Sequence, residues 1–199
     1  MKNGQKSAAA NVICIKWGDA YSASDVNRLY KMVRRNLHEH DLNFYCFTDK
    51  SDGFNEDIRV YPLPEIHLED PNDLKYVYRK EVGLCADDLA DLNGQRVLFF
   101  DLDVIITDEI DSMVRFAKDD EFVIINDWNS DGDEVGQATC YSWRVGTLGH
   151  IKQDFESRPK EVVQEYFTAS QAYLSAMVRK TIGPLQFWPE QWCKSFNFH

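Results

Sequence analysis

The most constraining feature of this sequence is one apolar run that carries two carboxylates, Asp101 and Asp103. The run extends from Val97 to Ile106 and does not alternate between apolar and polar residues. A continuous apolar strand is typical of the centre of a parallel sheet, where both faces are covered. Burying two acids there costs free energy unless a ligand compensates their charge. The run therefore predicts a central strand with a functional pair of acids.

The spacing of the two acids predicts what they bind. Residues two apart on a strand point to the same side, so Asp101 and Asp103 can face one ligand. At the carboxyl end of a parallel strand they would lie in the crevice where α/β sheets bind ligands. Carboxylate oxygens suit Mg²⁺ or Mn²⁺. The alternative without a ligand is a strand end whose acids pair with neighbouring Arg or Lys.

The elements around this run alternate in type. Four further apolar runs predict strands, and helical spacing predicts a helix capped by Ser24 and a long helix ended by Asn93-Gly94. The predicted strands are 12–17, 44–48, 58–61 and 122–126, and the predicted helices are 26–37, 74–92, 113–116, 161–167 and 171–178. This order predicts a three-layer α/β/α fold with a mainly parallel central sheet.

Length and charge limit the functional classes. The chain has 199 residues with 22 basic and 33 acidic side chains, a net charge of −11. This length predicts a single domain, 1–199. The acidic balance argues against non-specific nucleic-acid binding and against docking on an anionic membrane. No run approaches the roughly 18 apolar residues of a membrane span, and the start lacks the apolar core of a signal peptide.

The five cysteines carry a further expectation. They are scattered along the chain and form no CxxC pair. In a chain without a signal peptide, this pattern predicts reduced, buried thiols and a cytoplasmic protein.

Four segments, taken in order, resemble the nucleotide-binding half of a GT-A glycosyltransferase, nearest to the glycogenin and lipopolysaccharide galactosyltransferase type. They are 13–18, 47–49, 78–80 and 97–111. The resemblance implies a donor-binding half over 11–129 and an acceptor-side, closing segment over 130–199. It also implies transfer of a hexose from a UDP- or GDP-hexose to a hydroxyl of a carbohydrate or other acceptor. The donor sugar, the acceptor, the stereochemistry and the oligomeric state stay open.

The resemblance assigns the donor side of the site. Asp103 would be the stronger ligand of Mn²⁺ or Mg²⁺, and Asp101 would contact the metal or the ribose. In the loop after the first strand, Trp17 or Tyr21 would stack on the base, although ordinary packing is the alternative. The donor-binding residues implied are Lys16, Trp17, Gly18, Tyr21, Thr48, Asp49, Arg79, Lys80 and Asp101.

Arg79 and Lys80 are expected to serve the donor phosphates or a carboxylate of the acidic pair. Neighbours on a helix diverge by about 100°, so only one of them can face the site. The alternative is a solvated basic patch.

The resemblance also assigns the acceptor side. Asp127 follows the predicted strand 122–126 and would be the general base if the reaction inverts. Gln171 stands where similar enzymes carry an Asp-Gln pair, but Ser170 precedes it here. The acid of that pair is therefore absent or supplied elsewhere. His199 is a weak candidate for the additional metal ligand that many relatives carry near the carboxyl end.

The sequence leaves three alternatives to a glycosyltransferase site. The run 127–132 resembles half of an EF-hand loop, but Ala138 replaces the bidentate Glu, which favours an acidic loop. A haloacid-dehalogenase-like phosphohydrolase would use Asp101 as nucleophile and Asp103 as acid/base. In that fold the motif closes the first strand, whereas 100 residues precede Asp101 here. A non-catalytic GT-A-fold nucleotide or sugar binder is the third class.

Overall fold

The computed structural model describes residues 7–118, 120–129 and 134–196. Internal contacts divide the chain into two compact units. Unit 1 consists of Met1–Leu63 and Val97–Lys118, and unit 2 consists of Pro64–Arg96 and Asp119–His199. Each unit is therefore assembled from two separate stretches of sequence. The predicted division at residue 129 stays a prediction.

Unit 1 is built on parallel strands in the order β3-β2-β1-β4. The strands are β1 (Ser7–Lys16), β2 (His40–Thr48), β3 (Ile58–Pro62) and β4 (Arg96–Phe100). Ile13 lies opposite both Tyr45 on β2 and Phe99 on β4, and all three side chains are buried. The predicted strands at 12–17, 44–48 and 58–61 are therefore confirmed, with β1 and β2 beginning earlier than expected.

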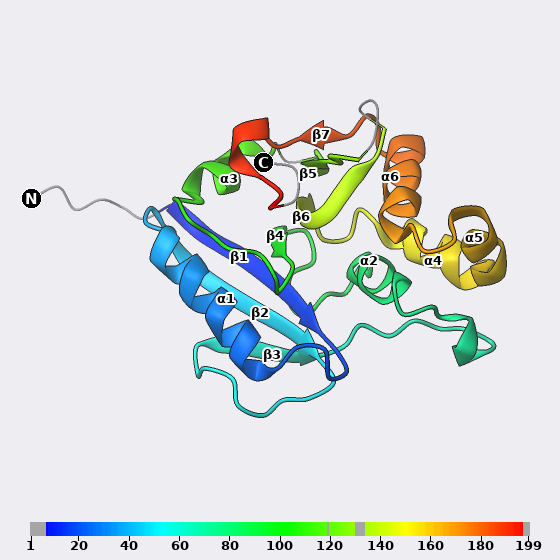
Figure 1. Ribbon diagram of the computed structural model, residues 1–199, viewed down its shortest axis with the longest axis horizontal. Helices are drawn as coiled ribbons and strands as arrows, with labels where there is room; N and C mark the ends of the chain where they lie inside the picture. The colour runs from blue at the N-terminus through cyan, green and yellow to red at the C-terminus, as the bar shows by residue number, and fades with distance from the viewer. Residues whose placement is uncertain (1–6, 119, 130–133, 197–199) are drawn as a thin grey trace, which may run out of the picture. The chain divides into compact units, whose positions relative to one another are not determined.

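Helix α1 (Ala23–Asn36) covers part of this sheet, and α3 (Asp111–Phe116) follows β4. Figure 1 shows α1 running along β1 and β2, and Val26, Leu29 and Val33 on its inner face are buried. The predicted Ser24 cap is wrong. The helix is capped two residues earlier, at Ser22, whose backbone N–H and hydroxyl both donate to the carboxylate of Asp25 at 2.8 Å.

The prediction that the apolar run 97–106 is one strand is wrong in its second half. β4 ends at Phe100, and residues 101–106 form a turn and an irregular segment. The carbonyl of Ile106 accepts hydrogen bonds from Arg35 and Asn36 of α1, both 3.3 Å, instead of a ladder bond. Apolar continuity could not reveal this break, because a buried turn and a buried strand are equally apolar.

Among its described residues, unit 2 has three strands in the order β6-β5-β7 and four α-helices. β5 (Val123–Asn126) pairs antiparallel with β6 (Gly136–Arg144) and parallel with β7 (Gln186–Phe187). The helices are α2 (Tyr78–Leu84), α4 (Gly149–Ser157), α5 (Pro159–Tyr166) and α6 (Ser170–Thr181). The predicted strand 122–126 and helices 161–167 and 171–178 are confirmed, whereas β6, α4 and β7 were not anticipated.

An aromatic cluster holds the helices of unit 2 together. Tyr78 on α2 stacks on Phe155 of α4 with ring centroids 5.2 Å apart, and Tyr173 of α6 lies at 6.3 Å from Tyr78. All three rings are fully buried. Such contacts add to the free energy gained from burying aromatic area.

The predicted long helix over 74–92 is wrong, because only Tyr78–Leu84 is helical. Ala90 has φ of +50°, which no right-handed helix accommodates. The carboxylate of Asp87 lies against Gly149 at the start of α4, so the chain turns away after Leu84. The apolar stripe was real, but it belonged to a short helix and a buried loop.

The predicted α/β fold class with a mainly parallel sheet is confirmed by these strands and helices. Within the part of the chain that the structure describes, none of the helices combines the length and the apolar character that crossing a membrane requires.

Candidate functional site

The carboxyl ends of the unit 1 strands bring together the residues predicted for the donor side. Lys16 at the end of β1 lies opposite Thr48 at the end of β2, and Asp101 directly follows β4. Parallel strands end at a common edge, which is where α/β sheets bind ligands. The structure thus groups at one edge the residues taken from three separate segments.

Asp101 and Asp103 converge on Tyr21 although neither acid is on a strand. Burial raises the pKa of the Tyr21 hydroxyl, and the charges of Asp103 and Asp101 and a hydrogen bond with Asp103 raise it further. Burial likewise raises the pKa of the Cys14 thiol, with contributions from Cys46 and Asp101. Asp101 is half-buried beside β1, and Asp103 is exposed. The turn therefore presents both carboxylates to the loop after β1.

That loop is held by contacts among the predicted donor-binding residues. The buried Lys16 donates from Nζ to the carbonyl of Gly18 at 3.2 Å, and the Gly18 N–H donates to Oδ2 of Asp49 at 2.9 Å. Gly18 has φ of +61°, a conformation that glycine adopts without strain. Lys16 and Asp49 thus shape the turn that carries the half-buried Trp17 and the exposed Tyr21.

The turn after β2 is held by Thr48 and by an ion pair of Lys50. The hydroxyl of Thr48 donates to the carbonyl of Lys50 at 3.1 Å and accepts from its N–H at 3.2 Å. Lys50 pairs with Asp19, and its hydrogen bond lowers the pKa of the Asp19 carboxyl. Contact with a nucleobase stays a prediction for Thr48 and Asp49.

The paired acids fit a cation that is shared with a ligand. Among the described residues there is no group of three His, Cys, Asp or Glu side chains that could hold a metal ion. Asp101 and Asp103 supply two hard oxygen ligands on one side of a turn. Mg²⁺-type ions are commonly held by one or two carboxylates, with water and phosphate oxygens completing the shell. The arrangement suits such an ion and does not form a closed cage.

In unit 2, the two predicted catalytic residues contact each other. Gln171, near the start of α6, donates from Nε2 to Oδ2 of Asp127 at 3.3 Å. The other carboxylate oxygen of Asp127 accepts from the N–H of Asn129 at 3.2 Å. The side-chain oxygen of Gln171 accepts from the N–H of Ala138 at 3.3 Å. These contacts assign the amide orientation, so Gln171 presents donors to Asp127.

A β-bulge supplies the backbone groups for this network. The register between β5 and β6 moves from Ile124–Tyr141 to Ile125–Gln137 and skips residues 138–140. Within that stretch, the N–H of Ala138 serves Gln171 and its carbonyl accepts from Nζ of Lys80 at 2.9 Å. Bulges next to functional sites commonly redirect polar groups in this way.

Of the two predicted basic residues on α2, Lys80 lies in this network. Its Nζ also lies 3.4 Å from Oε1 of Glu81. Arg79 is half-buried on the same helix. Binding of donor phosphates stays a prediction for both residues.

Sequence reasoning missed Ala138 and Glu81. Ala138 acts through its backbone, which no side-chain pattern reveals. Glu81 is buried, and its Oε2 has no hydrogen-bond partner among the described residues. A signal existed for Glu81, because it falls on the apolar face of α2 between Tyr78 and Cys85.

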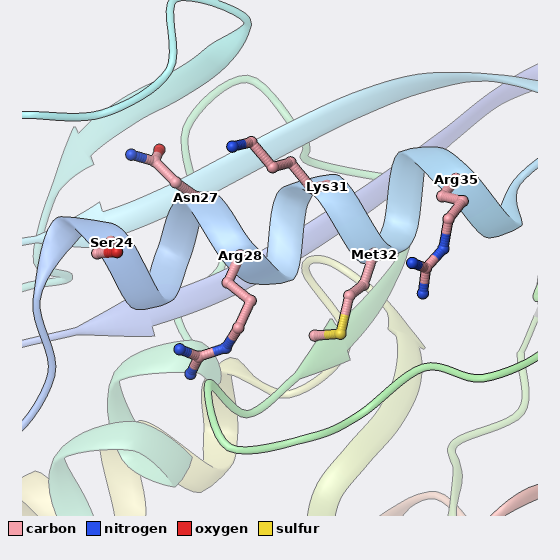
Figure 2. A pocket seen from close by; sticks show the side chains of 6 residues that line it. All are labelled: Ser24, Asn27, Arg28, Lys31, Met32 and Arg35. Carbon is pink, nitrogen blue, oxygen red and sulfur yellow. The ribbon is translucent and has the colours of Figure 1, made fainter.

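The groove on the outer surface of α1 is separate from these residues. It has a volume of about 460 Å³ and is lined by Ser24, Asn27, Arg28, Lys31, Met32 and Arg35. Figure 2 shows Arg28, Met32 and Arg35 on one side of the helix and Asn27 and Lys31 on the other. Arg28 pairs with Asp25 at 2.9 Å. Because one helix provides every wall, the groove is open surface and takes no part in the site.

Two predictions fall beyond the described residues. His199, the candidate additional metal ligand, lies outside them, and so do positions 130–132 of the EF-hand-like run. The described part of that run, 127–129, forms the turn after β5.

No family model matches this sequence, and no curated protein sequence matches it. The fold, in contrast, is that of solved glycosyltransferases. The galactosyltransferase LgtC, in complex with donor and acceptor sugar analogues, matches with a TM-score of 0.59 at 16% identity. That match covers 89% of this chain and 72% of LgtC. An active-site mutant of LgtC gives a TM-score of 0.60 at 15% identity, with the same coverage.

The glycosyltransferase GlyE of Streptococcus pneumoniae TIGR4 has the same fold. Its apo form matches with a TM-score of 0.62 at 12% identity, covering 94% of this chain and 46% of GlyE. The chain therefore spans less than half the length of GlyE. At these identities the likeness establishes the fold, and the predicted GT-A-type fold is confirmed.

Proposed function

We propose that this protein is a glycosyltransferase that moves a hexose from a nucleotide-diphosphate sugar to an acceptor hydroxyl. The observation that carries the proposal is the convergence of Asp101 and Asp103 on Tyr21 at the strand edge, in a fold shared with LgtC and GlyE. The sheet edge is where a parallel α/β fold binds ligands. In a chain with a net charge of −11, a cation between Asp101, Asp103 and a diphosphate would offset their mutual repulsion.

On the donor side, Asp101 and Asp103 would hold Mn²⁺ or Mg²⁺. When bound, such an ion would neutralise charge on the departing nucleoside diphosphate. The residues of the loop after β1 would bind and orient the nucleotide. The turn fixed by Lys16 and Asp49 presents Trp17 and Tyr21, whose aromatic faces suit stacking on a base.

On the acceptor side, Asp127 would accept the proton of the attacking hydroxyl if the reaction inverts. Gln171 donates to one oxygen of Asp127, and the N–H of Asn129 donates to the other. Both contacts hold the Asp127 carboxylate in place. In the transfer, the acceptor oxygen bonds to the anomeric carbon as the bond from that carbon to the diphosphate oxygen breaks.

Calorimetric titration of the protein with UDP and with GDP, with and without Mn²⁺, tests the proposal. Wild type should bind one of the two nucleotides in a manganese-dependent way, and Asp103→Asn should weaken that binding at least 100-fold. The matched control is Asp52→Asn, which changes the same charge on an exposed residue of unit 1. If wild type binds neither nucleotide when Mn²⁺ is present, the proposal is wrong.

Two outcomes separate the neighbouring functional classes. Nucleotide binding without hydrolysis or transfer across a panel of nucleotide sugars would favour a non-catalytic binder. Trapping of beryllium fluoride at Asp101 would favour the phosphohydrolase, because that reagent mimics an aspartyl phosphate.

The thiols support a cytoplasmic setting for this activity. All five cysteines are free, and Cys14, Cys46, Cys85 and Cys140 are buried. Free thiols persist in reducing compartments.

A further inference from the structure

Phe167 has a positive φ, a backbone conformation that a glycine would adopt without strain. It lies in the segment between α5 and α6, with φ of +50° and ψ of −112°. The N–H of Ala169 donates to the carbonyl of Tyr166 at 2.8 Å, which closes a four-residue turn with Phe167 in its second position. These angles define a type II′ turn, whose second position favours glycine because a Cβ is crowded there.

The side chain of Phe167 gains little from this position. It is 73% exposed, so the strain is not offset by burial of the ring. Single exposed apolar residues are ordinary, but an exposed aromatic ring at a turn position suited to glycine is not. The combination indicates that the ring itself is required.

Two hydrogen bonds hold the backbone of Phe167. The hydroxyl of the fully buried Tyr78 donates to the carbonyl of Phe167 at 2.9 Å, and the N–H of Phe167 donates to the carbonyl of Val163 at 2.8 Å. Four residues further on, Gln171 contacts Asp127. The backbone of Phe167 is therefore held in place, four residues before Gln171 in the chain.

We propose that Phe167 is a binding platform for a hexopyranose ring of the acceptor. The C–H groups on one face of a pyranose are weakly positive and apolar, and they complement the negative face of an aromatic ring. This inference rests on the proposed glycosyltransferase function and names a subsite for it. Because hydrogen bonds already hold the backbone of Phe167, little backbone freedom would be lost when a sugar binds its ring.

Saturation-transfer NMR with three free sugars tests the platform without turnover: methyl β-D-galactopyranoside, methyl β-D-glucopyranoside and lactose, each at millimolar concentration. Wild type should transfer saturation to at least one of them. Phe167→Ala and Phe167→Gly should each weaken its binding at least tenfold, and Phe167→Trp should retain it. The control is Phe196→Ala, because Phe196 is an 86% exposed aromatic of the same unit.

Thermal unfolding of the same variants separates a functional ring from a structural one. Phe167→Gly should raise the Tm by about 2–4 °C, since it removes the strain of a positive φ. Phe167→Ala should not raise it, because alanine keeps the Cβ. A ring required for folding would instead lower the Tm in both variants, and that result would overturn the proposal.

Two further results decide the proposal. It is wrong if none of the three sugars binds wild type, or if Phe167→Ala and Phe167→Gly bind them as wild type does. Manganese-dependent UDP or GDP binding, measured on the same samples, should be unchanged in every variant. If wild type binds a nucleotide but none of the three sugars, the platform alone is wrong, whereas absent nucleotide binding in wild type would count against the proposed function.

Discussion

The two units hold their functional side chains by different means. In unit 1, Lys16, Thr48 and Asp101 stand at or directly after strand ends, so the parallel ladder places them. In unit 2, Asp127 and Gln171 are 44 residues apart in sequence, and Gln171 donates directly to Asp127. The N–H of Ala138, in a bulge, donates to the side-chain oxygen of Gln171. Sheet edges are general features of a fold, whereas a bulge is a local exception to a ladder. The strand-end residues of unit 1 can therefore be predicted from sequence, whereas the contact at the bulge of unit 2 cannot.

The largest expected effect is a loss of stability on substitution of Asp111, whose carboxylate holds the chain between α1 and β2 in unit 1. Its buried carboxylate accepts from the N–H groups of His38 and Glu39, both 2.8 Å, and lies 2.9 Å from Nδ1 of His40. Asp111→Asn should lower the free energy of unfolding by about 3 kcal/mol, because buried donors lose their partner. Urea unfolding followed by tryptophan fluorescence measures it, with Asp52→Asn as the control. A loss below about 1 kcal/mol would contradict the anchoring role.

Gln171→Ala should reduce turnover without changing nucleotide binding, which would separate the functions of the two units. Asp127 loses one of its hydrogen-bond donors, so turnover should fall about 100-fold, or about 2.7 kcal/mol. The proposed metal ligands Asp101 and Asp103 belong to unit 1, so manganese-dependent nucleotide binding should stay unchanged. Steady-state kinetics with the preferred donor, together with calorimetry, separates the two effects. Equal losses in turnover and nucleotide binding would show that the units do not divide the work in this way.

Gly136→Ala tests how tightly the bulged strand is packed. A Cβ at Gly136 would lie 2.5 Å from Cγ2 of Ile124, which is buried, and the Gly136 N–H donates to the hydroxyl of Ser175 at 2.9 Å. Overpacking of this kind should cost about 1–2 kcal/mol. Thermal unfolding measures it, and the double variant with Ile124→Val should recover part of the loss. No recovery would place the strain elsewhere.

The smallest expected effect is the pH dependence of unit 1. Burial alone would raise the pKa of Asp111, but hydrogen bonds from His40, His38 and Glu39 outweigh it and lower the pKa. A carboxyl with a lower pKa in the folded state stabilises the fold above its unfolded pKa of about 3.9. That stability is lost as the pH falls further. The urea midpoint should therefore fall between pH 6 and pH 3 by more in wild type than in Asp111→Asn.

The sequence by itself determined the class of fold and the acidic pair. Apolar runs bounded by turn residues predicted the strands of unit 1, because burial on both faces of a sheet leaves a direct mark on composition. It also selected Asp127 and Gln171 through resemblance, but it gave no reason for them to meet.

Only the tertiary structure decided where the regular elements stop and how distant groups meet. The strand over 97–106 ends at Phe100, and the side chain of Asn36 donates to the carbonyl of Ile106 beyond it. The long helix over 74–92 shrinks to α2, and Ala90 beyond it has φ of +50°. The contact of Gln171 with Asp127 and the lock of Tyr78 on Phe167 join residues 44 and 89 positions apart. Such bonds depend on how the chain folds back on itself, which local patterns do not record.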